Sequence, residues 1–104
     1  MNMDIIINAI LQGKWFMSQH ARVRAGQREI SDADVIVALL QGQILEDYPE
    51  DPRGHSCLIL GHTPDKRAIH VVCAQDPGGS LVIITVYQPE PPAWVDEKTR
   101  KEGE

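Results

Sequence analysis

Residues 31–48 read SDADVIVALLQGQILEDY, and the hydrophobic pattern of the chain changes within this stretch. Asp34 follows Ser31 by three residues, which is close to the spacing of a helix capping box. The apolar run at residues 35–40 then predicts a largely buried helix, which Gly42 ends. From Gln43 to Tyr48 the pattern becomes strand-like. Helical sequence therefore lies upstream of Gly42 and strand sequence downstream of it.

Upstream of this stretch the chain predicts two further helices. The apolar residues 5–11 lie between Asp4, a good N-cap, and Gly13, a good residue to end a helix. The three consecutive isoleucines in this run would also suit a strand. Ser18 is a suitable N-cap for a helix over residues 19–27, and residues 14–17 predict an extended connector that packs on the core.

Downstream, the chain alternates between extended runs and turn-rich segments. Gly, Pro and Asp are frequent at residues 49–54, 63–66 and 76–79, and such short links favour hairpins over crossovers. The extended runs cover residues 43–48, 56–61, 67–74 and 81–88. We therefore predict a two-layer α+β fold in which three N-terminal helices pack on a four-stranded antiparallel β-meander. One sheet face would contact the helices and leave the other for solvent or a ligand.

Length and composition indicate one ordinary globular domain. The chain has 104 residues, of which 42% are hydrophobic and 24% charged. We predict a single domain over residues 1–95 and a frayed, charged tail over residues 96–104, with Trp94 as an anchor. No apolar run approaches the roughly 20 residues that span a bilayer, and no signal-peptide pattern is visible, so the expected location is the cytoplasm.

The charges are unevenly distributed. The net charge of −5 counts against non-specific binding of nucleic acid, which depends on neutralising phosphates. His20, Arg22, Arg24 and Arg28 nevertheless fall within nine residues, whereas acids cluster at residues 46–51. A local basic site on an acidic body is therefore possible.

Several kinds of chemistry lack their usual motifs in this chain. Cys57 and Cys73 lie inside apolar runs without CxxC spacing, so we expect buried, reduced core cysteines and no zinc site. The sequence contains no Gly-rich phosphate loop, no Gly-x-Ser-x-Gly elbow and no metal-ligand pattern. P-loop nucleotide hydrolysis and hydrolase-elbow chemistry are therefore removed from consideration, and no cofactor is expected.

The predicted helix at residues 19–27 carries the first candidate site. His20, Arg24 and Arg28 are spaced four residues apart, which places them along one helix face. Arginines can hold phosphate oxygens in a fork, and a histidine can move a proton near neutral pH. The alternative is a solvated helix face whose arginines pair with the acids at residues 46–51.

The third and fourth predicted strands carry the second candidate site. Strand alternation, with a turn between Pro77 and Gly78, places His70 opposite Thr85 and diagonal to Tyr87. Ordinary cross-strand packing is the alternative, because a slip of one residue in register would separate these side chains.

The motifs at both sites resemble a known family. Ser18-Gln19-His20-Ala21 followed by Arg24, Arg28 and Ile30-Ser31, together with Ile69-His70-Val71-Val72 and Ile83-Ile84-Thr85-Val86-Tyr87, is similar to domain of unknown function 4258. The resemblance covers about residues 5–100. It implies a RelE-like two-layer fold, because members of the family look similar to small RNA-cleaving toxins of the RelE and BrnT kind.

The resemblance also implies site residues and partners. Carried over by motif position, these residues are His20, Arg24, Arg28, His70, Thr85 and Tyr87. The implied partners are an RNA substrate and a cognate antitoxin-like protein. Family members often have Arg-Gly-Ile where this chain has Arg28-Glu29-Ile30, so we expect the left-handed position supplied by that glycine to shift to Gly26.

The first functional hypothesis is therefore a metal-independent endoribonuclease that uses the 2′-hydroxyl of its substrate as the nucleophile. In this hypothesis His20 and His70 would transfer protons, Arg24 and Arg28 would stabilise negative charge, and Thr85 and Tyr87 would contact the nucleotide. The second is a non-catalytic module that binds a protein through its sheet face or basic helix. The third is a site for a small anion on the face of His20.

Overall fold

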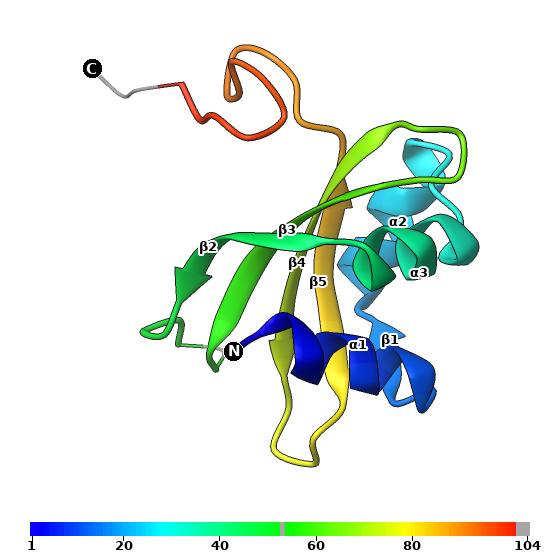
Figure 1. The fold of residues 1–104 in the computed structure, drawn as a ribbon, viewed down its shortest axis with the longest axis vertical. Coiled ribbons are helices and arrows are strands. Elements are labelled where there is room, and N and C mark those ends of the chain that lie inside the picture. Colours follow the sequence, from blue (N-terminus) through cyan, green and yellow to red (C-terminus); the bar gives the residue numbers. More distant parts are fainter. Residues whose placement is uncertain (53, 102–104) are drawn as a thin grey trace.

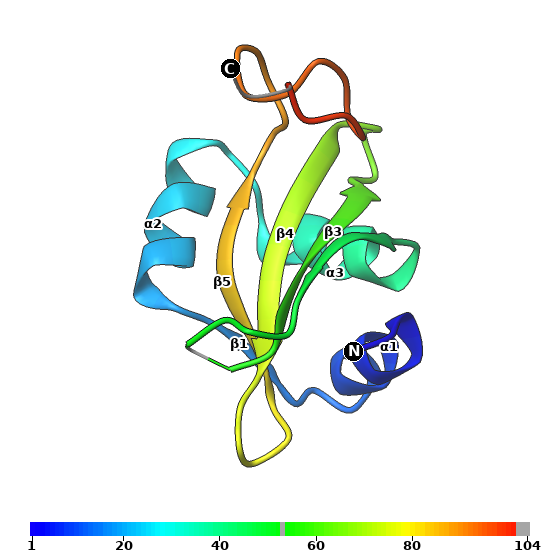
Figure 2. The ribbon, with the colours of Figure 1, turned by 90° about the vertical axis from the view of Figure 1, so that its left-hand side faces the viewer.

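The structure is a layer of helices packed on a five-stranded mixed sheet. A computed structural model describes residues 1–52 and 54–101. In chain order the elements are α1 (Met3–Leu11), β1 (Trp15–Met17), α2 (Gln19–Gln27), α3 (Asp32–Leu40), β2 (Gln43–Tyr48), β3 (Ser56–His62), β4 (Ala68–Gln75) and β5 (Leu81–Tyr87). The strand order in the sheet is β1-β5-β4-β3-β2. All three helices lie on one side of the sheet (Figure 1), and Figure 2 views the sheet from the other side.

The predicted four-stranded antiparallel meander is wrong, because the sheet has five strands and one of its strand pairs is parallel. Strands β2 to β5 do pair consecutively and antiparallel, but β1 adds a fifth strand that runs parallel to β5, with Trp15 opposite Leu81. The backbone N–H of Leu81 donates to the carbonyl of Lys14 at 2.8 Å, and that of Ser18 donates to the carbonyl of Ile83 at 2.9 Å. We predicted this segment as a connector because three residues are too few to show a period of two.

Local capping explains where the helices begin. The side chain of Ser18 accepts a hydrogen bond from the backbone of Ala21, and Ser31 forms a full capping box with Asp34, as predicted. Helix α1 differs, because the side chain of Asn2 rather than Asp4 accepts from the backbone of Ile5 at 3.0 Å. The three isoleucines are therefore helical, and the helix begins before the predicted position.

The hydrophobic core lies between the helices and the sheet. Its fully buried members include Val35 and Leu39 of α3, and Ile59 and Val71 of the central strands. Helix α3 packs directly on β3 at Gly61, where a Cβ atom would collide with the backbone of Ala38. Glycine is therefore needed here for close approach of the two layers.

The other sheet face is partly covered by residues 89–101, which we call the strap. Trp94 anchors it, as predicted, and only 3% of its surface is exposed. The Trp94 ring packs edge-on against the His70 ring, with 4.3 Å between the ring centres. Arg100 lies 4.6 Å from the Trp94 ring centre and donates two hydrogen bonds to the carboxylate of Glu46, at 2.8 and 3.1 Å. Residues 96–101 of the predicted tail belong to this strap, and residues 102–104 lie outside the described part of the chain.

The helices are short relative to a bilayer. None in the described part of the chain has the length and apolar character needed to cross a membrane.

Candidate anion-binding site

Helix α2 presents a row of three basic side chains. It buries Ala21 and Ala25, while His20 and Arg24 are exposed and Arg28 at its C-cap is partly buried. Within residues 1–52 and 54–101, the side chains of these three basic residues form no ion pair. We call His20, Arg24 and Arg28 the α2 row.

The alternative explanation for this row was pairing with the acids at residues 46–51, and the structure does not support it. Glu46 binds Arg100, Asp47 lies 2.5 Å from a ring nitrogen of His55, and the carboxylate of Asp51 accepts from the Ser56 hydroxyl at 2.6 Å. The guanidinium of Arg100 lowers the pKa of Glu46. These three acids are therefore engaged at the far edge of the sheet.

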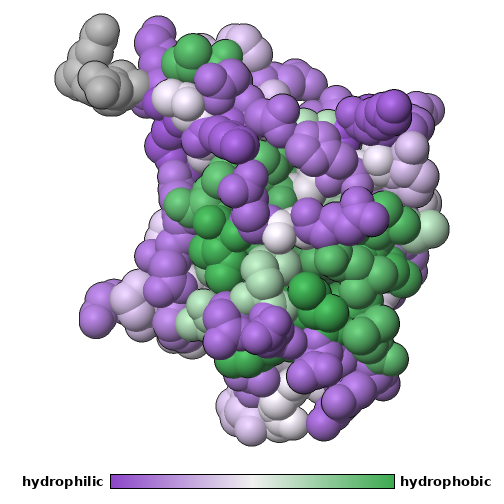
Figure 3. All heavy atoms as spheres, in the orientation of Figure 1, coloured by the Kyte–Doolittle hydropathy of each residue, from purple (hydrophilic) through white to green (hydrophobic). Residues whose placement is uncertain are grey.

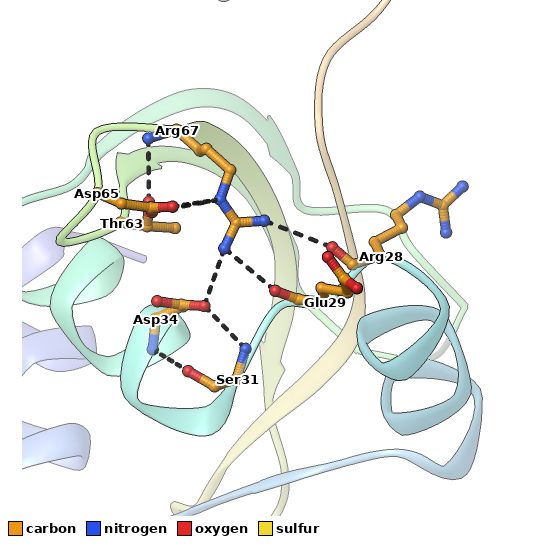
Figure 4. Close-up of polar contacts among 7 residues, drawn as sticks. All are labelled: Arg28, Glu29, Ser31, Asp34, Thr63, Asp65 and Arg67. Atoms are coloured by element: carbon orange, nitrogen blue, oxygen red, sulfur yellow. Dashed lines mark hydrogen bonds and ion pairs between the residues drawn. The ribbon is translucent and has the colours of Figure 1, made fainter.

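The side chain of Arg67 holds the corner between α2 and α3 through hydrogen bonds to backbone and carboxylate oxygens (Figure 4). Its guanidinium donates to the backbone carbonyls of Arg28 and Glu29 at 3.4 and 3.1 Å, and to the carboxylates of Asp34 and Asp65 at 3.2 and 3.1 Å. Figure 4 shows the side chain of Arg28 pointing away from this cluster. The backbone of Arg28 is thus held while its guanidinium stays available to a ligand.

The left-handed residue at this corner is Glu29, with φ of 55°. The expectation that Gly26 would take this role is wrong, because Gly26 lies inside α2. The left-handed conformation is therefore adopted at residue 29 itself, by a glutamate. The hydrogen bond from Arg67 to the Glu29 carbonyl helps to hold that conformation.

A cavity of about 340 Å³ opens beside Arg28. It lies between the end of α2, the end of β5 and the strap, and it is lined by Arg28, Tyr87, Gln88, Glu90, Ala93, Trp94 and Arg100. Arg100 is already neutralised by Glu46. Among the described residues that line the cavity, Arg28 is the cation without an ion pair, and the ring of Tyr87 forms an aromatic wall beside it.

The strand register places Tyr87 beside His70. His70 lies opposite Tyr87, and Val72 lies opposite Thr85. The predicted His70–Thr85 pair is therefore wrong by two residues: the hairpin pairs Gln75 with Leu81 rather than with Ser80, and the register shifts by one further residue after Val72. The expected common face for these side chains is nevertheless found, with Thr85 now at the diagonal position.

His70 is a buried, fully partnered histidine. Its side chain is 0% exposed, its Nε2 lies 2.7 Å from the carbonyl oxygen of Glu97, and its Nδ1 lies 3.3 Å from the Tyr87 hydroxyl. Since a carbonyl only accepts, Nε2 carries the proton and the Tyr87 hydroxyl donates to Nδ1. Burial lowers the pKa of His70 and raises that of Tyr87. His70 thus holds the strap and orients Tyr87.

The structure brings together some of the six predicted residues. Arg28 and Tyr87 line one cavity, and His70 contacts Tyr87 from beneath. His20 and Arg24 lie earlier on α2 and are not among the cavity-lining residues, and Thr85 is partly buried two residues before Tyr87. Trp94 was predicted as an anchor but not as part of a site, and the other strap residues of the cavity were not predicted, because no local pattern indicates that a Pro-rich segment packs against a strand end.

The comparisons with known proteins identify one family. The family model described as Domain of unknown function (DUF4258) matches residues 17–88. This segment includes α2, α3 and strands β2 to β5, and it leaves out α1 and the strap. Neither the curated proteins nor the solved structures contain a match. The strap wall of the cavity therefore lies beyond the family-matched segment.

Proposed function

The chain belongs to the DUF4258 family, and we propose that it is a metal-independent endoribonuclease of the toxin type. The observation that carries this proposal is the α2 row, whose three basic side chains have no ion-pair partner in the described residues and whose last member opens into the Tyr87 cavity. An anion with an attached ring system, such as a nucleotide, matches a free guanidinium beside an aromatic wall.

In the proposed reaction the 2′-hydroxyl of the RNA attacks the adjacent phosphorus. His20 removes the hydroxyl proton, and Arg24 and Arg28 stabilise the charge that develops on the phosphate oxygens. The bond to the 5′-oxygen then breaks, that oxygen takes a proton from solvent, and a 2′,3′-cyclic phosphate remains. Exposure of His20 and Arg24 agrees with action on a large substrate that stays outside the body of the protein.

The strand residues have supporting roles in this proposal. Tyr87 forms a wall for the nucleotide, and Thr85 supplies a hydroxyl on the same sheet face. Because both ring nitrogens of His70 are occupied within the fold, we assign it to positioning Tyr87 rather than to a second proton transfer.

Growth arrest and RNA cleavage test this function. We expect induced expression of the parent chain to arrest growth, and the purified protein to cleave RNA in the presence of a metal chelator. His20→Ala should reduce the cleavage rate by about 10²- to 10⁴-fold, the usual contribution of a general base. Arg24→Ala should also be strongly impaired, because its charge is lost from the transition state.

Arg22→Ala is the matched control, because Arg22 is exposed on the same helix but lies 4.0 Å from Asp32 instead of facing a free anion site. It should retain parental activity. Circular dichroism should show an unchanged fold for all three variants, since each side chain is exposed. Full activity of His20→Ala would contradict the assignment.

A second candidate function is binding of an antitoxin-like protein without catalysis. Figure 3 shows apolar side chains gathered over α1 and α3, and Ile5 and Leu11 of α1 are 37% and 69% exposed. Exposed apolar patches of this kind mark protein interfaces. In this case the chain would not cleave RNA, and its complex with the product of a neighbouring gene would be lost on Leu11→Glu, as measured by size-exclusion chromatography.

A further inference from the structure

Two cysteines lie directly opposite each other on neighbouring strands. Cys57 of β3 pairs with Cys73 of β4, and their sulfur atoms are 3.9 Å apart. Both thiols are free and both residues are 0% exposed. Directly opposed residues in antiparallel strands have Cα atoms about 4.5–5.5 Å apart, which lies inside the range of disulfides. Rotation of the two side chains is therefore sufficient to join them.

The two thiols are chemically different. The two thiols are within hydrogen-bonding distance, and this contact with Cys73 lowers the pKa of Cys57. The same interaction, together with burial, raises the pKa of Cys73 well above its ordinary value. Because the thiolate is the reactive form, Cys57 is the sulfur that reacts first, and Cys73 is placed to attack it afterwards.

A partly exposed side chain, Met1, contacts the pair. The sulfur of Met1 lies 3.7 Å from that of Cys57, and Met1 precedes the first residue of α1 with its side chain partly exposed. Because Met1 is partly exposed, we expect displacement of its side chain to give a reagent close to water in size access to Cys57.

We propose that Cys57 and Cys73 form a peroxide-responsive dithiol. The Cys57 thiolate attacks hydrogen peroxide, takes one oxygen as a sulfenic acid and releases hydroxide. The Cys73 sulfur then attacks the Cys57 sulfur, the disulfide forms, and the sulfenic oxygen leaves with protons as water. Peroxide is reduced and the two thiols are oxidised, so the step needs no other reagent.

The disulfide would act on the segment that supports the candidate site. It would close the loop from Cys57 to Cys73, which contains His62, Arg67 and His70. Arg67 fixes the α2 corner, and His70 and His62 contact Glu97 of the strap. Oxidation therefore restricts the hairpin that carries these contacts, independently of whether the chain cleaves RNA.

Treatment of the native protein with hydrogen peroxide tests the proposal. The intact mass should fall by two hydrogen atoms, a non-reducing digest should link the peptides of Cys57 and Cys73, and a dithiol reductant should reverse both changes. Oxidation of methionine adds oxygen and is separated by the same digest. Cys73→Ala should accumulate sulfenic acid on Cys57, trapped by dimedone, and Cys57→Ala should form no trapped product.

The parent chain alone decides the outcome if either variant fails to fold. A linked peptide pair formed under native conditions supports the proposal. Absence of that link under native conditions, while the urea-unfolded chain is oxidised by the same reagent, would overturn it. Equal dimedone labelling of Cys57 and Cys73 in the two variants would overturn the assigned order of attack.

Discussion

Two non-glycine residues adopt positive φ in the described part of the chain, and Arg67 adjoins or binds both. Glu29 has φ of 55° and Lys66 has φ of 69°. An L-residue in the left-handed region costs about 1–2 kcal/mol, which the surrounding structure must offset. At Glu29 the offset includes a hydrogen bond from Arg67 to its backbone carbonyl. The glutamate side chain itself contributes nothing to this bond.

Replacing Glu29 with glycine should therefore stabilise the protein. Glycine adopts the left-handed conformation freely but loses more entropy on folding, so we expect a net gain of about 0.5–1 kcal/mol in the free energy of unfolding. Urea unfolding followed by circular dichroism measures it. Glu29→Ala is the matched control, because alanine removes the charge but keeps the strain, and it should leave stability unchanged. Equal effects of the two substitutions would show that charge, not backbone conformation, is responsible.

Residue-scale features were predictable where they are local in sequence. The caps at Ser18 and Ser31 were predicted correctly, because each depends on residues within three positions. Arg67 was not singled out, because its contacts to Arg28 and Glu29 lie 39 and 38 residues away. No sequence period indicates such contacts, since they exist only after β4 lies beside the α2–α3 corner.

At the scale of elements, the strap is held on the sheet by groups that titrate. His70 must be neutral to accept from Tyr87, and burial keeps its pKa below the ordinary value of 6.5. Glu46 must be ionised to hold Arg100, and this contact lowers its pKa below 4.5. Both groups therefore favour the folded state most when they are deprotonated.

The stability of the protein should consequently fall as the solution is acidified. Below about pH 6.5 the unfolded chain binds a proton at His70 more readily than the folded chain does, so this contribution is present above pH 6.5 and is lost as pH falls towards the lowered pKa. Urea midpoints between pH 7.5 and 5 measure the slope. His70→Gln should be less stable at neutral pH but should show a flatter slope in this range. An unchanged slope would exclude His70 as its source.

Strand prediction succeeded for the longer strands and failed for the shortest. Strands β2 to β5 have six to eight residues and alternate or form apolar runs, which is enough to identify them. Strand β1 has three residues and pairs with β5, which is distant in the sequence. The hairpin register and its shift after Val72 were equally invisible, and together they place Tyr87 rather than Thr85 opposite His70.

On the scale of the whole molecule, the net charge of −5 limits how RNA can be bound. Three arginines in the described residues are close to acids: Arg22 to Asp32, Arg67 to Asp34 and Arg100 to Glu46. Among the described arginines, Arg24 and Arg28 form no ion pair, and they are the arginines of the α2 row that can neutralise phosphates. The proposed substrate would therefore be held by few phosphate contacts, in contrast to proteins with extended basic surfaces.

This predicts a shallow dependence of RNA affinity on salt. Each phosphate contact to a single strand contributes about −0.7 to the slope of log K against log salt, so two arginines give a slope of about −1.4. Fluorescence anisotropy with a 2′-O-methylated RNA, which cannot be cleaved, measures it. Arg24→Ala should reduce the slope by about half, whereas Arg22→Ala should leave it unchanged. A steep slope in the parent would contradict the limited number of contacts.

The pairing of β1 with β5 also matters while the protein is being synthesised, because it joins segments that are far apart in the sequence. The Ser18 hydroxyl at the start of α2 donates to the carbonyl of Ile84, 66 residues later, and α2 packs against β5. A ribosome synthesises α2 well before the strand that seats it, and such distant contacts form slowly. During synthesis the nascent chain thus carries the residues of the candidate site long before it has the site itself.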